Sequence, residues 1–229
     1  MSRSSRSPWP RRLLLVAVLA FTAYEAGFAV RIWQLRDHNP RTTAFMQARR
    51  AAAPSAAIVH RWLPYRGISP ALKRAVIAGE DTTFVEHGGF DWEGIATALD
   101  RDVRAGEIVA GGSTISQQLA KNLFLSAERS VTRKAQEAVL TVMLEAMLSK
   151  RRILEIYLNV IEWGRGVFGA EAAARHYFGV DAAALNPAEA ARLAAMIPSP
   201  RYYDRHGATA ALRARAATLR QRMSQVRIP

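Results

Sequence analysis

The chain has 229 residues, enough for one catalytic domain with an anchor but not for two large domains. Half of its residues are hydrophobic, so it can bury a sizeable core, and it contains no cysteine, which excludes disulfides, zinc thiolate sites and thiol nucleophiles. The formal net charge is +13, which favours an anionic partner.

The first predicted element is an almost wholly apolar segment at residues 13–33, in which Glu25 and Arg31 are the only charges. About 21 residues rising about 1.5 Å each span roughly 31 Å, close to a bilayer core of about 30 Å. Residues 1–12 carry four arginines and no acid, which places them in the cytoplasm and the rest of the chain outside. A cleaved signal peptide is the alternative, but no clear small-x-small cleavage site follows the apolar run. We therefore predict a transmembrane helix.

The charge of the remaining chain also bears on its partners. The four arginines of residues 1–12 account for +4 and residues 13–33 are neutral, which leaves +9 for the rest. A basic body behind a membrane anchor favours an anionic partner at the membrane surface. Nucleic acid is a rival anion that an exported domain rarely meets, so we expect no nucleic acid partner. Plain solubility would also explain the charge.

Residues 34–57, interrupted by Pro40 and Pro54, are predicted to be a partly helical juxtamembrane connection, and residues 58–229 a single domain. No alternating strand pattern of any length appears, so the domain should be mainly α-helical. Glycines between residues 164 and 169 indicate a loop. Apolar periodicity and capping residues predict helices at 71–78, 91–105, 114–123, 132–163, 170–177, 187–196 and 208–222.

The first candidate site is the acidic pair Glu80-Asp81, which follows the end of an apolar helix and precedes a glycine-rich turn. Carboxylates at such a position can be partly desolvated, which raises their basicity and suits general acid or base work on a sugar hydroxyl. Ordinary surface charge is an equal alternative on spacing alone. His87 lies in the turn without a second histidine at ligand spacing, so we expect a hydrogen-bonding support and not a metal ligand.

The second candidate site is a polar helix face, on which Thr114, Gln117, Gln118 and Lys121 follow one another at three- and four-residue spacing. Amide side chains both donate and accept hydrogen bonds, which suits sugar hydroxyls and amides. A solvated helix face is the alternative.

The third candidate site is a group of cations near a helix start, formed by Arg129, Arg133 and Lys134. Glu137 lies four residues after Arg133, so these two can pair on one face. Such a group can clamp a diphosphate. Taken alone, the pattern favours an ordinary basic turn with one salt bridge.

Together these blocks resemble the five signatures of the peptidoglycan glycosyltransferases, in the family's order, over roughly residues 58–200. Each signature is moderately specific, and five in order are very specific. The matching residues are Glu80-Asp81-x-x-Phe84-x-x-His87-x-Gly89-x-Asp91, Gly112-Ser113-Thr114-x-x-Gln117-Gln118-x-x-Lys121-Asn122, Arg133-Lys134-x-x-Glu137, Lys150-x-x-Ile153-Leu154-Glu155-x-Tyr157-Leu158-Asn159, and Arg165-Gly166-x-x-Gly169 with Ala173 and Tyr177-Phe178-Gly179.

The resemblance implies a lysozyme-like helical fold with a larger lobe and a smaller lobe that dips into the membrane, and lipid II as the substrate. It implies that Glu80 is the base that deprotonates the 4-hydroxyl of the acceptor, and that Glu137 is a second catalytic residue near the leaving diphosphate. A divalent cation, Mg²⁺ or Mn²⁺, is allowed there, and no organic cofactor is expected. The implied substrate-binding residues are Asp81, Ser113, Thr114, Gln117, Gln118, Lys121, Asn122, Arg129, Arg133, Lys134 and Asn159.

The chemistry of the reaction agrees with this residue set. Lipid II carries an α-linked diphosphate and the polymer bond is β, so one inverting displacement needs one base and strong stabilisation of the departing anion. The sequence lacks Ser-x-x-Lys and Lys-Thr-Gly, so it resembles the monofunctional type without a penicillin-binding domain. We expect a single-pass protein of the cytoplasmic (inner) membrane with its catalytic domain on the periplasmic or extracellular side. The expected partners are lipid II, the growing glycan strand, the membrane, and division or elongation proteins.

Two other functions fit a helical domain with one catalytic acid. A lysozyme-like cell-wall hydrolase or lytic transglycosylase needs no diphosphate clamp, so the cations and the anchor favour synthesis over cleavage. A non-catalytic anchored module that binds glycan would not need both Glu80 and Glu137.

Overall fold

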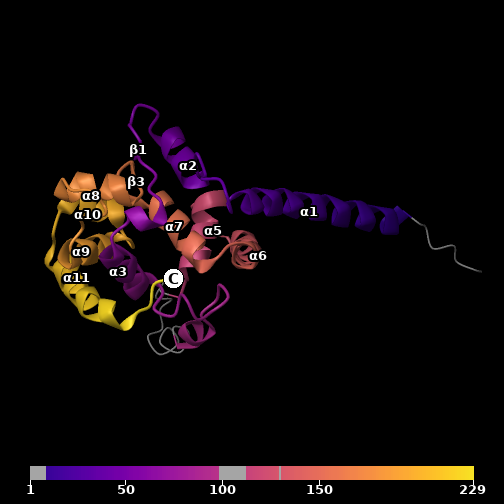
Figure 1. Cartoon of the computed structure of the whole chain (residues 1–229). Coiled ribbons are helices and arrows are strands. Elements are labelled where there is room, and N and C mark those ends of the chain that lie inside the picture. The colour runs from indigo at the N-terminus through magenta and orange to yellow at the C-terminus, as the bar shows by residue number, and fades with distance from the viewer. Residues whose placement is uncertain (1–8, 98–111, 129) are drawn as a thin grey trace, which may run out of the picture.

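The computed structural model describes residues 9–97, 112–128 and 130–229 (Figure 1). Helices dominate the described residues, which confirms the predicted fold class. Figure 1 shows one long helix, α1 (Trp9–Gln34), that projects away from the body formed by the other elements.

Helix α1 is exposed along most of its length and packs against the body near its C-terminal end. By length and composition, residues Arg11–Gln34 could cross a membrane, and they form the only such helix among the described residues. Ile32 is fully buried and Glu25 is buried where α1 contacts α6 (Val131–Met147). Helix α1 therefore exposes an apolar surface along most of its length and packs against α6 near its C-terminal end.

The part of the body next to α1 is a group of helices around α5 (Ile115–Phe124), which packs against α6, α7 (Lys150–Val160) and α2 (Ala44–Ala52). Each helix of this group begins at a hydroxyl side chain that accepts a hydrogen bond from a backbone N–H of the first turn. These N-cap residues are Thr43, Thr114, Ser130 and Ser149.

The other part of the body is built around α3 (Pro70–Glu80), which packs against α9 (Pro187–Met196) and α11 (Ala210–Arg222). Figure 1 shows these three helices together on the side of the body away from α1. The remaining elements of this part are η1 (Tyr65–Gly67), α8 (Ala170–Phe178), α10 (Pro200–His206) and η2 (Met223–Gln225).

A small sheet of strand order β1-β3-β2 packs against α8 and α10. β1 (Val59–His60) is parallel to β3 (Val167–Phe168), and β2 (Glu162–Gly164) is antiparallel to β3. The expectation of a loop at 164–169 was therefore wrong, because part of this segment is the second strand of a hairpin. Strands this short carry no readable alternation, which is why the sequence did not indicate them.

The helix predicted at 132–163 is also wrong, because it is two helices, α6 and α7. Leu148 adopts an extended conformation, with φ −118° and ψ 147°, and Ser149 then caps α7 by accepting a hydrogen bond from Arg152 N. Helix α10 was not predicted. The prediction of 187–196 is confirmed at both ends. Residues 92–97 are helical, and the remainder of the helix expected at 91–105 lies outside the described residues.

Candidate active site

Glu80 is the last residue of α3, and its side chain is only 10% exposed. Its Oε2 accepts a hydrogen bond of 2.9 Å from Gln118 Nε2 of α5. The hydroxyl of Tyr157 on α7 donates to Gln118 Oε1 at 2.8 Å. Because this hydroxyl occupies the amide oxygen, the NH₂ group of Gln118 is turned toward Glu80. Three helices thus fix the position of one carboxylate oxygen.

The second oxygen of Glu80 has a different environment. Oε1 is buried and accepts no hydrogen bond from any described residue, although Arg215 Nη2 of α11 lies 3.5 Å away. Burial raises the pKa of Glu80, and the neighbouring charge of Asp81 raises it further, whereas the hydrogen bond from Gln118 and the cations Arg215 and Lys121 lower it. The carboxylate is therefore more basic than usual and has one oxygen available to take a proton.

Asp81 follows Glu80. Its side chain is buried, and both of its oxygens form hydrogen bonds within the protein. Its Oδ2 accepts from Ile115 N at 3.0 Å, and its Oδ1 lies 2.8 Å from His87 Nε2. Gly89 N donates to His87 Nδ1 at 3.0 Å, so the proton of the neutral ring lies on Nε2 and is donated to Asp81. His87 is thus a support, as predicted, and Asp81 ties the end of α3 to the start of α5.

Three other residues expected at the substrate are likewise occupied inside the fold. Thr114 and Gln117 form a capping box at the start of α5, and Thr114 Oγ1 donates to Gly89 O at 2.7 Å. Asn159 is fully buried, and it exchanges hydrogen bonds with both backbone groups of Leu63 at 2.8 and 2.9 Å. These hydrogen bonds hold the three side chains in place, and their contact with substrate stays a prediction.

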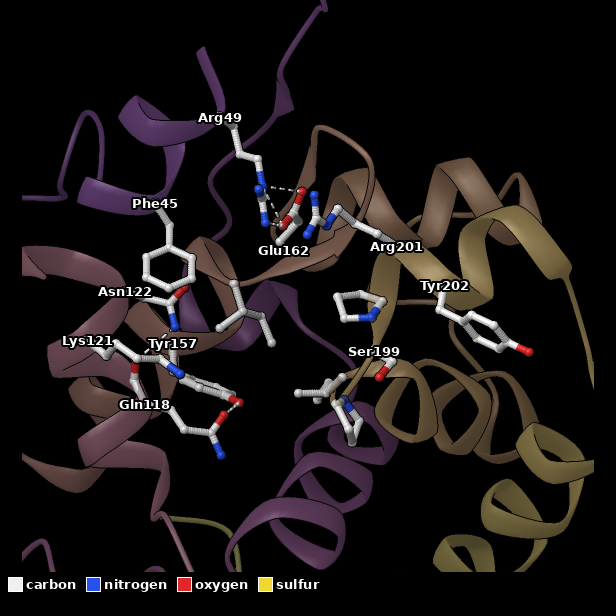
Figure 2. Close-up of a pocket in the computed structure, with 14 residues that line it drawn as sticks. Phe45, Arg49, Gln118, Lys121, Asn122, Tyr157, Glu162, Ser199, Arg201 and Tyr202 are labelled. Atoms are coloured by element: carbon white, nitrogen blue, oxygen red, sulfur yellow. Dashed lines mark hydrogen bonds and ion pairs between the residues drawn. The ribbon is translucent and has the colours of Figure 1, made fainter. Parts of the chain in front are cut away.

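Three of the residues of α5 that were predicted to bind substrate line a cavity of about 430 Å³, the main cavity (Figure 2). Gln118, Lys121 and Asn122 form one wall with Tyr157, as Figure 2 shows. The opposite wall is the segment 197–202, and helix α2 contributes Phe45 and Arg49. Lys121 Nζ lies 5.8 Å from the centroid of the Phe45 ring, a cation–π distance.

A smaller cavity of about 50 Å³ lies on the other side of Gln118. Glu80, Asp81 and Ser113 are among the residues that line it. Ser113 is exposed, and its carbonyl oxygen accepts a hydrogen bond of 3.4 Å from Gln118 Nε2. Gln118 therefore links the acidic pair to the main cavity, which brings the first two predicted blocks together.

The third block lies on α6, which packs against α5. Arg133 Nη1 donates to Glu137 Oε2 at 2.8 Å, which confirms the predicted pair, and Lys134 pairs with Glu137 Oε1. Arg129 lies outside the described residues. Both oxygens of the buried Glu137 are thus used by cations. Glu137 therefore holds the two cations in place.

These contacts do not fit a divalent cation as they stand, because such an ion needs free oxygen ligands. Within the described residues, no group of three or more histidine, aspartate or glutamate side chains is placed to hold a metal. We therefore derive no step through a metal ion.

Comparison with known sequences decides the family. The sequence model described as Transglycosylase matches residues 49–224. A biosynthetic peptidoglycan transglycosylase from Methylobacillus flagellatus is 55% identical over 95% of this chain and 97% of its own length. Proteins of the same name from Laribacter hongkongensis and Chromobacterium violaceum are 54% and 52% identical over 96% and 95% of this chain, and over 99% and 97% of their own lengths. The chain belongs to the transglycosylase family.

The transglycosylase domain has a lysozyme-like fold, so family membership confirms the fold that the resemblance implied. The family match begins within α2, so it includes Arg49 of the main cavity.

Sequence reasoning missed several residues of the transglycosylase site. Tyr157 belongs to the fourth signature, but its hydrogen bond to Gln118 follows only from the packing of α7 against α5. Arg215 is one of several arginines of α11, and no local pattern distinguishes it from the others. Phe45, Arg49 and Arg201 lie outside the matched signatures, and only the closed fold brings them to the cavity.

Proposed function

We propose that the chain polymerises lipid II into glycan strands of peptidoglycan, by inverting transfer of the growing strand to the 4-hydroxyl of the next disaccharide with release of undecaprenyl diphosphate. The chain is an enzyme of this class by family. The observation that carries the catalytic assignment is the buried Glu80, with one oxygen held by Gln118 and the other without a hydrogen bond from a described residue.

In this reaction Glu80 accepts the proton of the acceptor's 4-hydroxyl. That hydroxyl oxygen forms a bond to the anomeric carbon of the growing strand, and the bond from this carbon to the diphosphate breaks with inversion. A base must be ionised beforehand and basic enough to take the proton, which the raised pKa of Glu80 supports. The Gln118–Tyr157 hydrogen bonds support the orientation of the carboxylate.

The departing diphosphate carries the negative charge that develops in the transition state. Lys121 faces the main cavity, and Arg133 and Lys134 lie on the adjacent helix α6. We assign these cations to the leaving group, because cations fixed before the reaction stabilise a developing anion without reorganising. Glu137 holds Arg133 and Lys134 in position through its two oxygens.

We further propose that α1 crosses the cytoplasmic membrane once, with residues 1–12 inside and the catalytic domain on the periplasmic or extracellular side. The apolar helix and the arginines before it support this orientation. Helix α6 adds exposed apolar residues beside α1, among them Val131 and Val142, which are 87% and 55% exposed. An apolar surface next to an anchor fits contact with lipid.

The test is to incubate the purified full chain with lipid II in detergent and to resolve the products by size. Polymer formation supports the proposal, and conversion of added glycan strands to fragments would instead identify a hydrolase or lytic transglycosylase. An inactive but folded wild-type chain would favour a binding module. The Glu80→Gln variant serves as the matched negative control, because it keeps the side-chain shape and removes the proton acceptor.

A further inference from the structure

A second large cavity adjoins the main cavity on its α2 side. It has a volume of about 350 Å³ and is lined by the C-terminal end of α2, the chain that follows it, the β2–β3 turn and α10. We name it the arginine cavity because Arg49, Arg165 and Arg201 all line it. Arg49, Glu162 and Arg201 line both cavities, so the two cavities are neighbours that share part of one wall.

One of the three arginines is already paired. Arg49 Nε lies 2.9 and 3.1 Å from the two oxygens of Glu162, and Arg49 Nη2 adds a contact of 2.9 Å, as the dashed lines in Figure 2 show. Glu162 is only 9% exposed, so this pair is a fixed part of the wall. Glu162 thus offsets the charge of Arg49 and leaves the other two arginines to give the cavity its positive charge.

The side chains of Arg165 and Arg201 are exposed to solvent. No hydrogen bond or ion pair joins either side chain to a residue that the structure describes. The backbone of Arg165 is nevertheless held, because its N–H donates to Asp204 Oδ2 at 3.0 Å. Two cations whose side chains pair with no described residue can therefore bind an anion at little cost in lost ion pairs.

The walls between these arginines are small and apolar. They include Ala52, Ala53, Ala56 and Ala57. Gly166 closes the cavity at the β2–β3 turn with φ +71°, and a Cβ there would lie 2.6 Å from Ala57 O. Such walls accept methyl groups and offer few partners to sugar hydroxyls. The cavity therefore suits an anion attached to a short chain with small side chains.

We propose that the arginine cavity binds carboxylates of the peptide that the glycan substrate carries. This inference rests on the proposed function, because lipid II and the growing strand bear alanine-containing peptides with free carboxylates. The diphosphate is assigned to the cations of α5 and α6, so it does not compete for this cavity. Arg165 and Arg201 each form an ion pair with a peptide carboxylate, and the alanine walls contact the peptide's methyl groups.

The experiment compares two substrates in the full chain in detergent: lipid II with free peptide carboxylates, and the same lipid II with these carboxylates amidated. Wild-type protein should use the free form with a kcat/KM roughly fivefold higher, the worth of one or two partly exposed ion pairs. In the double variant Arg165→Gln/Arg201→Gln this preference should disappear, because kcat/KM falls more on the free form than on the amidated form. The matched control is Arg220→Gln/Arg222→Gln, which removes the same charge from exposed positions of α11.

Each outcome decides the proposal. Equal use of both substrates by the wild type overturns it, as does an equal loss on both substrates in the double variant, which would indicate general damage to the cleft. Loss of the preference in the control variant would show that overall charge, and not this cavity, selects the substrate. If the wild type makes no polymer from either substrate, the proposed function has failed first. In that case, binding of a soluble disaccharide-peptide to the wild type and to the double variant tests the cavity without the reaction. Equal affinity of the two proteins overturns the inference.

Discussion

Gln136 Nε2 of α6 donates a hydrogen bond of 3.1 Å to Glu25 Oε2 of helix α1. Glu25 is 8% exposed, and its other oxygen is buried without a hydrogen bond from any described residue. In the membrane-spanning helix that we propose, an ionisable side chain is costly unless it has a partner. Because α6 also carries Arg133 and Lys134, this contact joins α1 to the helix whose cations we assign to the diphosphate.

The contact predicts that α1 contributes more than membrane attachment. Glu25→Leu should weaken the α1–α6 contact by roughly 0.5–2 kcal/mol and slow polymerisation even in detergent, where local concentration at a membrane plays no part. The exchange Glu25→Gln with Gln136→Glu should restore both properties, because it keeps a carboxylate–amide hydrogen bond. Thermal unfolding and initial rates in detergent measure the two effects. The matched control is Leu19→Ala on the exposed surface of α1, and an equal effect there would contradict a specific contact.

The buried position of Glu80 predicts that its replacement lowers activity without lowering stability. Glu80→Gln should lower polymerisation by roughly 10²–10⁴-fold, the usual worth of a positioned base. Burial raises the pKa of Glu80 in the folded protein, so ionisation of Glu80 at neutral pH lowers the free energy of unfolding. A neutral glutamine at this position does not have this destabilising effect. The variant should therefore unfold at the same temperature as wild type or slightly higher at neutral pH. A folded variant with near-normal polymerisation would refute the role of Glu80.

Arg215 predicts a change in the pH dependence of the reaction. Glu80 acts in its ionised form, so kcat/KM should fall as the pH drops through its pKa. Arg215 favours the ionised form and thereby lowers this pKa, as do Lys121 and the hydrogen bond from Gln118, whereas Asp81 raises it. Arg215→Gln removes one stabilising cation, so the acidic limb of the profile should move to higher pH while the rate at its plateau changes little.

The control for this shift is Arg220→Gln, an exposed arginine of the same helix. It removes the same charge from the protein and should leave the acidic limb in place. A limb that moves equally in both variants would attribute the shift to net charge. A limb that moves in neither variant would show that Arg215 has no influence on Glu80.

Much of the candidate site could be predicted because it depends on short spacings. The Arg133–Glu137 pair follows from four-residue spacing on a helix, and Glu80 follows from a matched signature at a helix end. The contact of Arg215 with Glu80 could not be predicted, because it depends on how α11 packs beside α3. The signatures also do not indicate contacts within the protein, such as the hydrogen bond from Ile115 N to Asp81 Oδ2.

The fold was predictable to a similar degree and for similar reasons. Helix α9 has Pro187 in its first turn and an Asn186 cap, so its start is encoded locally. The break between α6 and α7 was missed because apolar residues continue at helical spacing on both sides of it. Ser149 is a good N-cap, but a serine in an otherwise helical stretch is ambiguous until the packing of both helices is known.

Asn159 and Asn122 allow the last prediction, since the same change at each should have opposite consequences. Asn159 is fully buried, and its side chain bonds Leu63 N, Leu63 O and Glu155 O. Asn159→Ala leaves the backbone groups of Leu63 without these partners, so it should lower the free energy of unfolding by about 3 kcal/mol. Asn122 lines the main cavity, and its side chain makes one hydrogen bond within the described residues, to Gln118 O at 2.8 Å.

Asn122→Ala should therefore cost about 1 kcal/mol or less in stability and act mainly by raising KM for lipid II. Asn159→Ala should leave KM close to the wild-type value at temperatures where the variant is folded. Denaturant unfolding and steady-state kinetics on both variants separate the two roles. A raised KM in folded Asn159→Ala protein would instead support a contact between Asn159 and the substrate.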